Sequence, residues 1–347
     1  MKLFVACHSM AARSVGLAAF GTLAALLLAL PLTSPAAQDT RFFRIGTGST
    51  SGTYFPIGTV LAGAISNPPG SRSCEDGGSC GVPGLIAVTQ ATHGSVQNIE
   101  LITNGQAESG FSQADIAYWA FFGETMFEQG GPRQRLRALA NLYPEMMHVV
   151  VRRESGISSI NSLVGRRVSL GATGSGTAID AALILSSYGI ATGDYEVVRQ
   201  MPGPSADLMQ SGAIDALFIV GGAPYPALVE LAGRVDLRLL AIDGKQADDL
   251  VADHPFFFRT RIEDGTYSGV DGVSTLSVGA QWLIAADLDE DLVYRITRSL
   301  WHPSTRRLLE SGHPDGRQIK LETALKGIAI PLHDGAARYY REAGLLQ

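Results

Sequence analysis

Two glycine-rich segments have the composition of turns that hold anions. Residues 46–56 read GTGSTSGTYFP, and residues 171–180 read GATGSGTAID. Each follows an apolar run that predicts a strand and precedes a run that predicts a helix. Glycine lets the backbone approach a ligand closely, and the first N–H groups of a helix lack intrahelical acceptors and carry partial positive charge. Either turn alone could be only a tight connection, but two in matching contexts favour a carboxylate or phosphate held between two parts of the chain.

Nucleotide-binding and hydrolase motifs do not fit these segments. The first turn reads GxGxxxG rather than the GxGxxG of dinucleotide-binding folds, and the next acidic residue, Glu75, is not where a ribose-binding carboxylate is expected. The second turn lacks the lysine of a P-loop. Neither turn contains the GxSxG of hydrolases, and the sequence has no HExxH pattern. We therefore expect no catalytic residues, no metal site and no cofactor.

The segment FSQADIAYWAFFG, residues 111–123, adds a third candidate position. The pattern predicts a helix capped by Ser112, which would place Gln113 at its N-terminus with an amide able to donate to a ligand oxygen. Asp115 would then complement the helix dipole. The aromatic residues that follow are interpreted as core rather than as a platform for a ligand.

Composition limits the fold and the partners. The chain has 347 residues, of which 46% are hydrophobic and 17% are charged, which suits one large domain or two of ordinary size and argues against disorder. Acidic residues outnumber basic ones by 33 to 27, giving a net charge of −6. An acidic balance argues against a nucleic-acid partner.

The N-terminal residues 1–36 have the pattern of an export signal. Lys2 and Arg13 are followed by the apolar run of residues 15–32 and then by small residues. This pattern predicts a Sec-type signal peptide cleaved after Ala36. An uncleaved anchor is the alternative, because the apolar run is nearly long enough to span a bilayer. The mature chain would carry a net charge of −8, since the removed segment contains two positive charges and no negative ones.

Two cysteines remain after residue 36, within NPPGSRSCEDGGSCGVPG. An exported chain meets an oxidising compartment, so we expect a disulfide between Cys74 and Cys80 that fixes an exposed loop. Free thiols are the main alternative. A zinc site would need more ligands, and the nearest histidine is His93.

The rest of the chain alternates predicted strands and helices, which indicates an α/β fold with mostly parallel sheets. Strands are expected over residues 41–47, 85–90, 136–142, 146–153, 166–171, 195–200, 214–222, 237–242 and 274–286. Helices are expected over residues 53–65, 95–105, 112–123, 158–165, 177–189, 206–212 and 225–233, and from residue 289 towards the end.

Together, the motifs from Arg44 to the end resemble the TAXI-type solute-binding proteins of TRAP (tripartite ATP-independent periplasmic) transporters. They appear in the order IGTGSTSGTYFPIG, GSVQNIELITNG, FSQADIAYWAFFG, LRALANLYPEMMHVVVRRESGI, SLVGRRVSLGATGSGT, SGAIDALFIVGGAP and PLHDGAARYYREAGL. The resemblance implies a bilobed type II periplasmic-binding fold, with crossover strands at a hinge that correspond to residues 146–153 and 274–285. Lobe 1 is then expected over residues 37–147 plus 275–347, and lobe 2 over residues 148–274.

The resemblance also implies a function. A monomeric periplasmic receptor would capture a small carboxylate, such as glutamate, 2-oxoglutarate or another dicarboxylate, and deliver it to the TRAP membrane permease. The implied ligand-binding residues are Ser49, Gly52, Thr53, Tyr54, Gln113, Ser175, Gly176 and Thr177. One alternative is a subunit that presents its ligand to a membrane sensor kinase, and a remote one is an enzyme on the same fold.

Overall fold

The computed structural model describes residues 40–347, and the expected signal peptide lies outside them. Within this range the main sheet has ten strands, eight of them in the order β4-β1-β5-β12-β6-β9-β7-β8, while β10 pairs with β6 and β11 with β12. The strands are β1 (Arg41–Gly46), β4 (Leu85–Gln90), β5 (Ser109–Gln113), β6 (Leu136–Arg152), β7 (Arg167–Ser169), β8 (Glu196–Val198), β9 (Ala216–Gly221), β10 (Leu237–Leu239), β11 (Phe258–Ile262) and β12 (Val273–Ala285). A separate pair consists of β2 (Ser66–Asn67) and β3 (Val82–Pro83).

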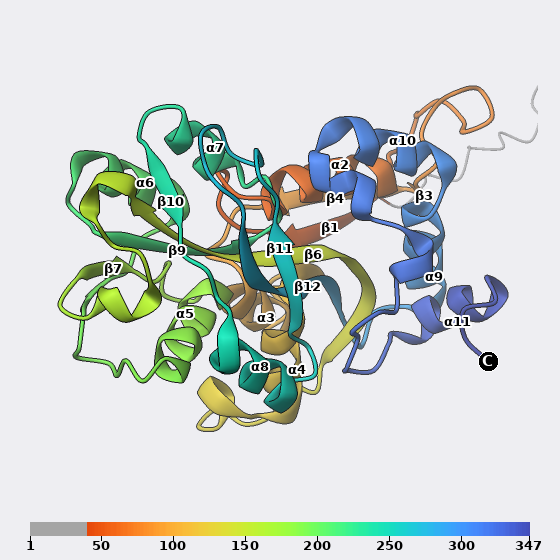
Figure 1. The fold of residues 1–347 in the computed structure, drawn as a ribbon. Coiled ribbons are helices and arrows are strands. Elements are labelled where there is room, and N and C mark those ends of the chain that lie inside the picture. Colours follow the sequence, from red (N-terminus) through yellow and green to blue (C-terminus); the bar gives the residue numbers. More distant parts are fainter. Residues whose placement is uncertain (1–39) are drawn as a thin grey trace, which may run out of the picture. The chain divides into compact units, whose positions relative to one another are not determined.

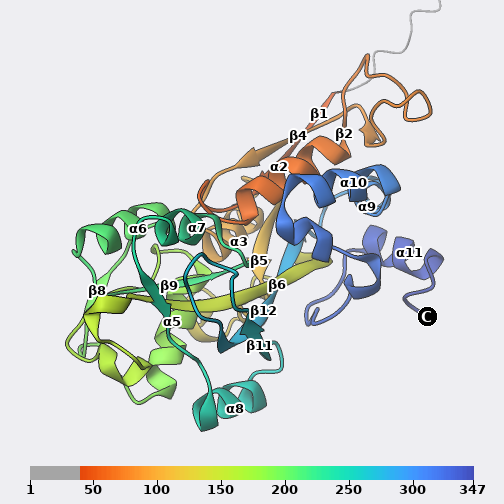
Figure 2. The same ribbon diagram turned by 45° about the horizontal axis from the view of Figure 1, so that its top comes forward.

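The sheet consists of two parallel groups joined by two long antiparallel strands. Strands β4, β1 and β5 are parallel, and so are β9, β7 and β8. Between the groups, β6 and β12 are antiparallel to each other and to their outer neighbours β9 and β5. Figures 1 and 2 show β6 running from one group to the other with β12 alongside. The expected α/β fold with crossover strands between two lobes is confirmed.

The helices are α2 (Tyr54–Ile65), α3 (Ser95–Thr103), α4 (Ala114–Phe122), α5 (Gly176–Ser187), α6 (Pro202–Ser211), α7 (Pro226–Ala232), α8 (Gly244–Asp253), α9 (Glu290–Leu300), α10 (Pro303–Gly312) and α11 (Asp334–Glu342). Short 3₁₀ turns are η1 (Thr125–Phe127), η2 (Arg153–Ser155), η3 (Ile160–Leu163), η4 (Pro314–Gln318) and η5 (Leu321–Thr323). We call β1, β4 and β5 with α2–α4 and α9–α11 the first lobe, and β7–β9 with α5–α7 the second lobe. The residue boundaries expected for the two lobes stay a prediction.

Three differences from the expected elements have simple causes. Strand β6 is one strand of 17 residues rather than two, because the chain continues extended through Pro144 and Glu145, with Pro144 opposite Gly279 of β12. Pro and Glu interrupt the apolar run, and this interruption suggested a break. Helix α8 and strand β11 were not expected, and only Ala247 and Leu250 of α8 are buried. Two buried positions give a weak helical pattern.

The apolar cores follow this arrangement. One core contains Phe43 of β1, Ile57 of α2 and Trp282 of β12, and helix α10 packs beside α2 within the first lobe (Figure 1). A second core belongs to the second lobe and β6. A third core includes residues from both lobes, such as Ala117 of α4 and Ile184 of α5. The two lobes are therefore joined by packing as well as by the shared strands. Among residues 40–347, no helix has the length and apolar character needed to cross a bilayer.

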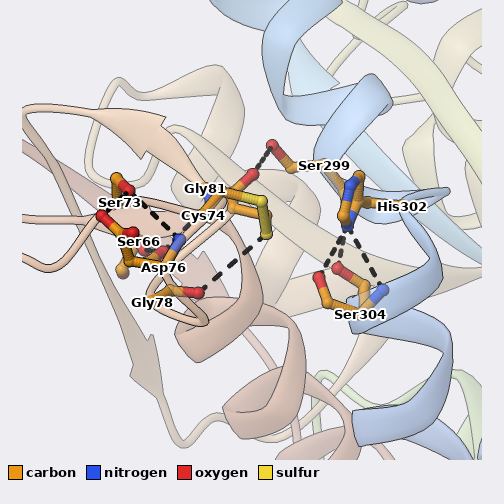
Figure 3. The surroundings of a disulfide bond; sticks show 12 residues. Ser66, Ser73, Cys74, Asp76, Gly78, Gly81, Ser299, His302 and Ser304 are labelled. Carbon is orange, nitrogen blue, oxygen red and sulfur yellow. Dashed lines mark hydrogen bonds between the residues drawn. A yellow bond between two sulfur atoms is a disulfide. The ribbon is translucent and has the colours of Figure 1, made fainter.

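The expected disulfide between Cys74 and Cys80 is present (Figure 3). Its loop lies against α9, where the Ser299 hydroxyl donates to the Cys80 carbonyl oxygen at 3.2 Å. The His302 ring lies near both sulfur atoms, but sulfurs in a disulfide are not thiolate ligands for a metal. The His302 Nδ1 atom instead accepts from the Ser304 backbone N–H at 3.2 Å.

Replacing both cysteines with serine should lower the free energy of unfolding by about 2 kcal/mol, because the crosslink restricts a short loop in the unfolded chain. Urea unfolding of the double variant beside the oxidised wild type measures this loss. The native circular dichroism spectrum should be unchanged, since most of this loop is exposed. A decrease in the free energy of unfolding well beyond about 2 kcal/mol, or loss of the folded state, would contradict a purely local role of the disulfide.

Candidate functional site

All eight residues proposed as ligand-binding border one cavity between the two lobes, with a volume of about 60 Å³. They come from the turn before α2, the end of β5 and the turn before α5, three segments far apart in the sequence. The other lining residues are Gly48, His93, Gly94, Ser95, Glu145, Gly171, Ala172, Gln200, Pro202, Leu217, Phe218, Val220 and Tyr225. None of the described lining residues is a lysine or an arginine.

Two helices of 12 residues each begin at the cavity. Helix α2 follows Thr53, whose side chain makes no capping bond, and α5 follows Ser175, whose Oγ accepts from the Ala178 backbone N–H at 3.2 Å. The first N–H groups of these helices, at Tyr54, Gly176 and Thr177, have no intrahelical acceptor and border the cavity. The aligned dipoles add partial positive charge. The cavity therefore has donors for an anion without a formal cation.

Gln113 joins the lobes instead of offering its amide to the cavity. Its Nε2 atom donates to Asp180 Oδ2 of α5 at 2.6 Å, and its backbone N–H donates to the Ser95 hydroxyl oxygen at 3.1 Å. The expected Ser112 cap is wrong, because Ser112 lies in β5 and Gln113 itself precedes the first residue of α4 without a side-chain capping bond. Gly176 lies directly against Gln113, since a Cβ atom there would overlap Gln113 Oε1.

An acid pair lies behind Gln113, with one member from each lobe. Asp115 of α4 and Asp180 of α5 are both fully buried. Within the described residues, both carboxyl oxygens of Asp115 and Oδ1 of Asp180 have no hydrogen-bond partner. Burial raises the pKa of both carboxyls, and the neighbouring Asp115 charge raises that of Asp180 further. Both shifts favour the protonated carboxyl, so this pair gives Asp115 a role beyond the dipole partner expected of it.

Glu145 is a cavity residue that the sequence analysis missed. It lies in β6, its side chain is 2% exposed, and its Oε2 accepts from the Tyr54 hydroxyl at 2.7 Å. Burial raises the pKa of Glu145 well above its ordinary value, and the charges of Asp115 and Asp315 raise it further, against the opposing effect of the Tyr54 bond. An acidic residue within a mostly apolar strand was the signal available in the sequence.

Hydrogen bonds between the lobes surround the cavity. His93 Nδ1 donates to the Thr173 carbonyl oxygen at 2.9 Å, and the Gln97 backbone N–H donates to the Gly174 carbonyl oxygen at 3.1 Å. On the α2 side, the Ala227 backbone N–H donates to the Ser51 carbonyl oxygen at 3.2 Å. The structure therefore shows the two lobes in contact.

A further buried acid, Asp315 of η4, lies against Gly222 of the second lobe, where a Cβ atom would overlap Asp315 Oδ2. Its Oδ1 accepts from Gln318 Nε2 at 2.9 Å. Burial raises the pKa of Asp315 to about 7 and lowers that of His313, whose Nδ1 is 3.6 Å from Asp315 Oδ2. Both shifts favour the neutral forms, so we do not regard this contact as an ion pair.

Replacing Gly176 with alanine should displace the Gln113 amide and break its bond to Asp180. We expect a loss of about 1–3 kcal/mol in the free energy of unfolding, as for overpacked interiors. Gly63→Ala is the matched control, because a Cβ atom at this exposed position in α2 meets nothing within 4 Å and should be neutral or slightly stabilising. Equal urea midpoints for the two variants would contradict the Gln113 contact.

Asp315 should make folding depend on pH. Its pKa is about 7 in the folded chain against an ordinary value of 3.8, so the unfolded chain loses its proton first as pH rises. The contribution of Asp315 to the free energy of unfolding should therefore decrease by up to about 4 kcal/mol as the pH rises from about 4 to about 7. Above about pH 7 this contribution should stay constant. Asp315→Asn should therefore lose less stability than the wild type between pH 5 and pH 8. Identical pH profiles from chemical unfolding would overturn this assignment.

The fold and the family can be compared with known proteins. A solved protein from Bordetella bronchiseptica RB50 aligns with a TM-score of 0.50 at 14% identity, over 88% of this chain and 82% of that chain. The alkanesulfonate-binding protein SsuA from Xanthomonas axonopodis pv. citri, bound to MOPS, aligns with a TM-score of 0.48 at 16% identity. This alignment covers 88% of this chain and 85% of that chain. The ligand-binding component of an ABC-type import system from Staphylococcus aureus, with zinc bound, aligns with a TM-score of 0.48 at 9% identity. This alignment covers 88% of this chain and 93% of that chain.

At 14% identity, the alignment with the Bordetella bronchiseptica RB50 protein shows a shared fold and not a shared ligand. The sequence itself matches the profile of one family over residues 45–344, which include both glycine-rich turns and every cavity residue. By this match, the chain belongs to the NMT1-like family.

Proposed function

We propose that this protein is a periplasmic solute receptor that captures a small organic acid between its two lobes. The observation that carries the proposal is the convergence of residues 49, 52–54, 113 and 175–177 on one cavity bordered by both lobes. Neither lobe alone contains all of these groups, so a ligand there would contact both.

The chemistry of the cavity supports an anionic group on the ligand. The N-termini of α2 and α5 supply backbone N–H donors and partial positive charge. Ser49 and Thr53 add hydroxyls at the same wall. A volume of about 60 Å³ suits a small ligand such as a carboxylate of few carbons.

The mechanism would be closure rather than catalysis. Strands β6 and β12 connect the lobes, and the hydrogen bonds that His93 and Ala227 make across the cavity exist only while the lobes touch. A ligand that bonds to both lobes would favour this closed arrangement through its differential affinity. No bond of the ligand is made or broken.

Delivery to a TRAP permease is the finer part of the proposal. It rests on the TAXI-type motifs between Arg44 and the C-terminus, which include both turns and the end of β5. The export pattern of residues 1–36 supports a periplasmic location.

A thermal-shift screen of residues 37–347 tests the receptor proposal. The protein is unfolded and refolded to remove any carried ligand, then mixed with amino acids, keto acids and dicarboxylates. One chemical class should raise the melting temperature, since a ligand at about 100 times its Kd adds about 2.7 kcal/mol. Gly176→Ala should lose most of this shift, and Gly63→Ala should keep it. If no compound in the panel raises the melting temperature, the proposal that the ligand is a small organic acid is contradicted.

A further inference from the structure

The cavity wall contains a carboxyl group that anion binding does not explain. Glu145 projects from β6 into the cavity bordered by the N-termini of α2 and α5, and it is 2% exposed. The Tyr54 hydroxyl bonds to its Oε2 at 2.7 Å, and no described residue makes a hydrogen bond to its Oε1. One oxygen of a buried acid is therefore available to a ligand.

The described residues that line the cavity around Glu145 include no lysine or arginine. The titratable groups that interact with Glu145 or border it are Tyr54 from α2, Tyr143 from β6, Tyr225 before α7, Asp115 from α4, Asp180 from α5, Asp315 from η4 and, on the cavity wall, His93. Apart from the histidine, these are hydroxyls and acids. Burying an acid without a compensating partner is unfavourable, so this position has a cost that a ligand could offset.

We propose that the ligand carries a protonated amine beside its anionic group, and that Glu145 is the residue that selects the amine. The ligand carboxylate would lie at the helix N-termini, and the ammonium would bond to the available Glu145 oxygen. This inference rests on the proposed receptor function and narrows its ligand to zwitterionic compounds such as amino acids.

The proton balance of this step is defined. In the empty cavity Glu145 is favoured in its neutral form, since burial raises its pKa. When an ammonium arrives, the Glu145 proton leaves to solvent and an ion pair forms. The competing arrangement, in which neutral Glu145 donates its proton in a hydrogen bond to a second ligand carboxylate, releases no proton.

Matched ligand pairs test the inference by calorimetry. The probes are L-glutamate with glutarate, L-aspartate with succinate, and L-alanine with propionate, which differ only by the amine. We expect at least one amino acid to bind at least about tenfold more tightly than its deaminated partner. Repeating the titration in two buffers of different ionisation enthalpy should show that protons are released when the amino acid binds.

Glu145→Gln separates selection of the amine from structural support. Glutamine keeps the shape and an acceptor for Tyr54 but cannot ionise, so affinity for the amino acid should fall at least about tenfold and proton release should disappear. The variant should unfold no more easily than the wild type, because a buried acid is removed. Glu128→Gln is the control, with the same change at an exposed residue outside the cavity, and should bind normally.

The outcomes distinguish this inference from the receptor function. Equal or tighter binding of a deaminated partner, or a Glu145→Gln variant that keeps its affinity for the amino acid, would overturn amine selection and leave the receptor intact. If no member of any pair binds, both amine selection by Glu145 and the proposed receptor function are overturned.

Discussion

The pairing of β6 with β12 is the constraint on which the rest of the structure depends. These two strands run antiparallel through nine residue pairs and belong to the sheets of both lobes. Because β5 pairs with β12 on one side and β9 with β6 on the other, their register fixes how the two parallel groups face each other. The helices that follow β1 and β7 then begin at the same place, and this place is the cavity.

In and around the cavity, the protonation of the acids depends on exclusion of water rather than on ion pairs. Glu145, Asp115, Asp180 and Asp315 are all buried, and for each of them burial is the largest cause of a raised pKa. The arginine pairs of the described residues lie elsewhere, as between Arg44 and Glu108 at 2.7 Å, where water screens the charges. The site thus combines backbone donors with buried acids whose protonated forms are favoured by burial.

Local pattern was sufficient to predict much of the fold and part of the site. Glycine-rich turns after apolar runs identified both helix N-termini, and the export pattern together with the two cysteines left after residue 36 identified the disulfide. The partner of Gln113 could not be predicted, because Asp180 lies 67 residues away and on the other lobe. Glu145 was missed for a related reason, since its meaning depends on Tyr54, 91 residues away in sequence. Helix α8 has too few buried residues to produce a clear period.

The Asp115–Asp180 pair has a consequence for the whole molecule, because each lobe contributes one carboxyl. The neighbouring Asp115 charge acts on Asp180 only while the two lobes touch, so this part of the raised pKa of Asp180 depends on the contact between α4 and α5. By linkage, a proton on Asp180 and the contact between α4 and α5 therefore favour each other.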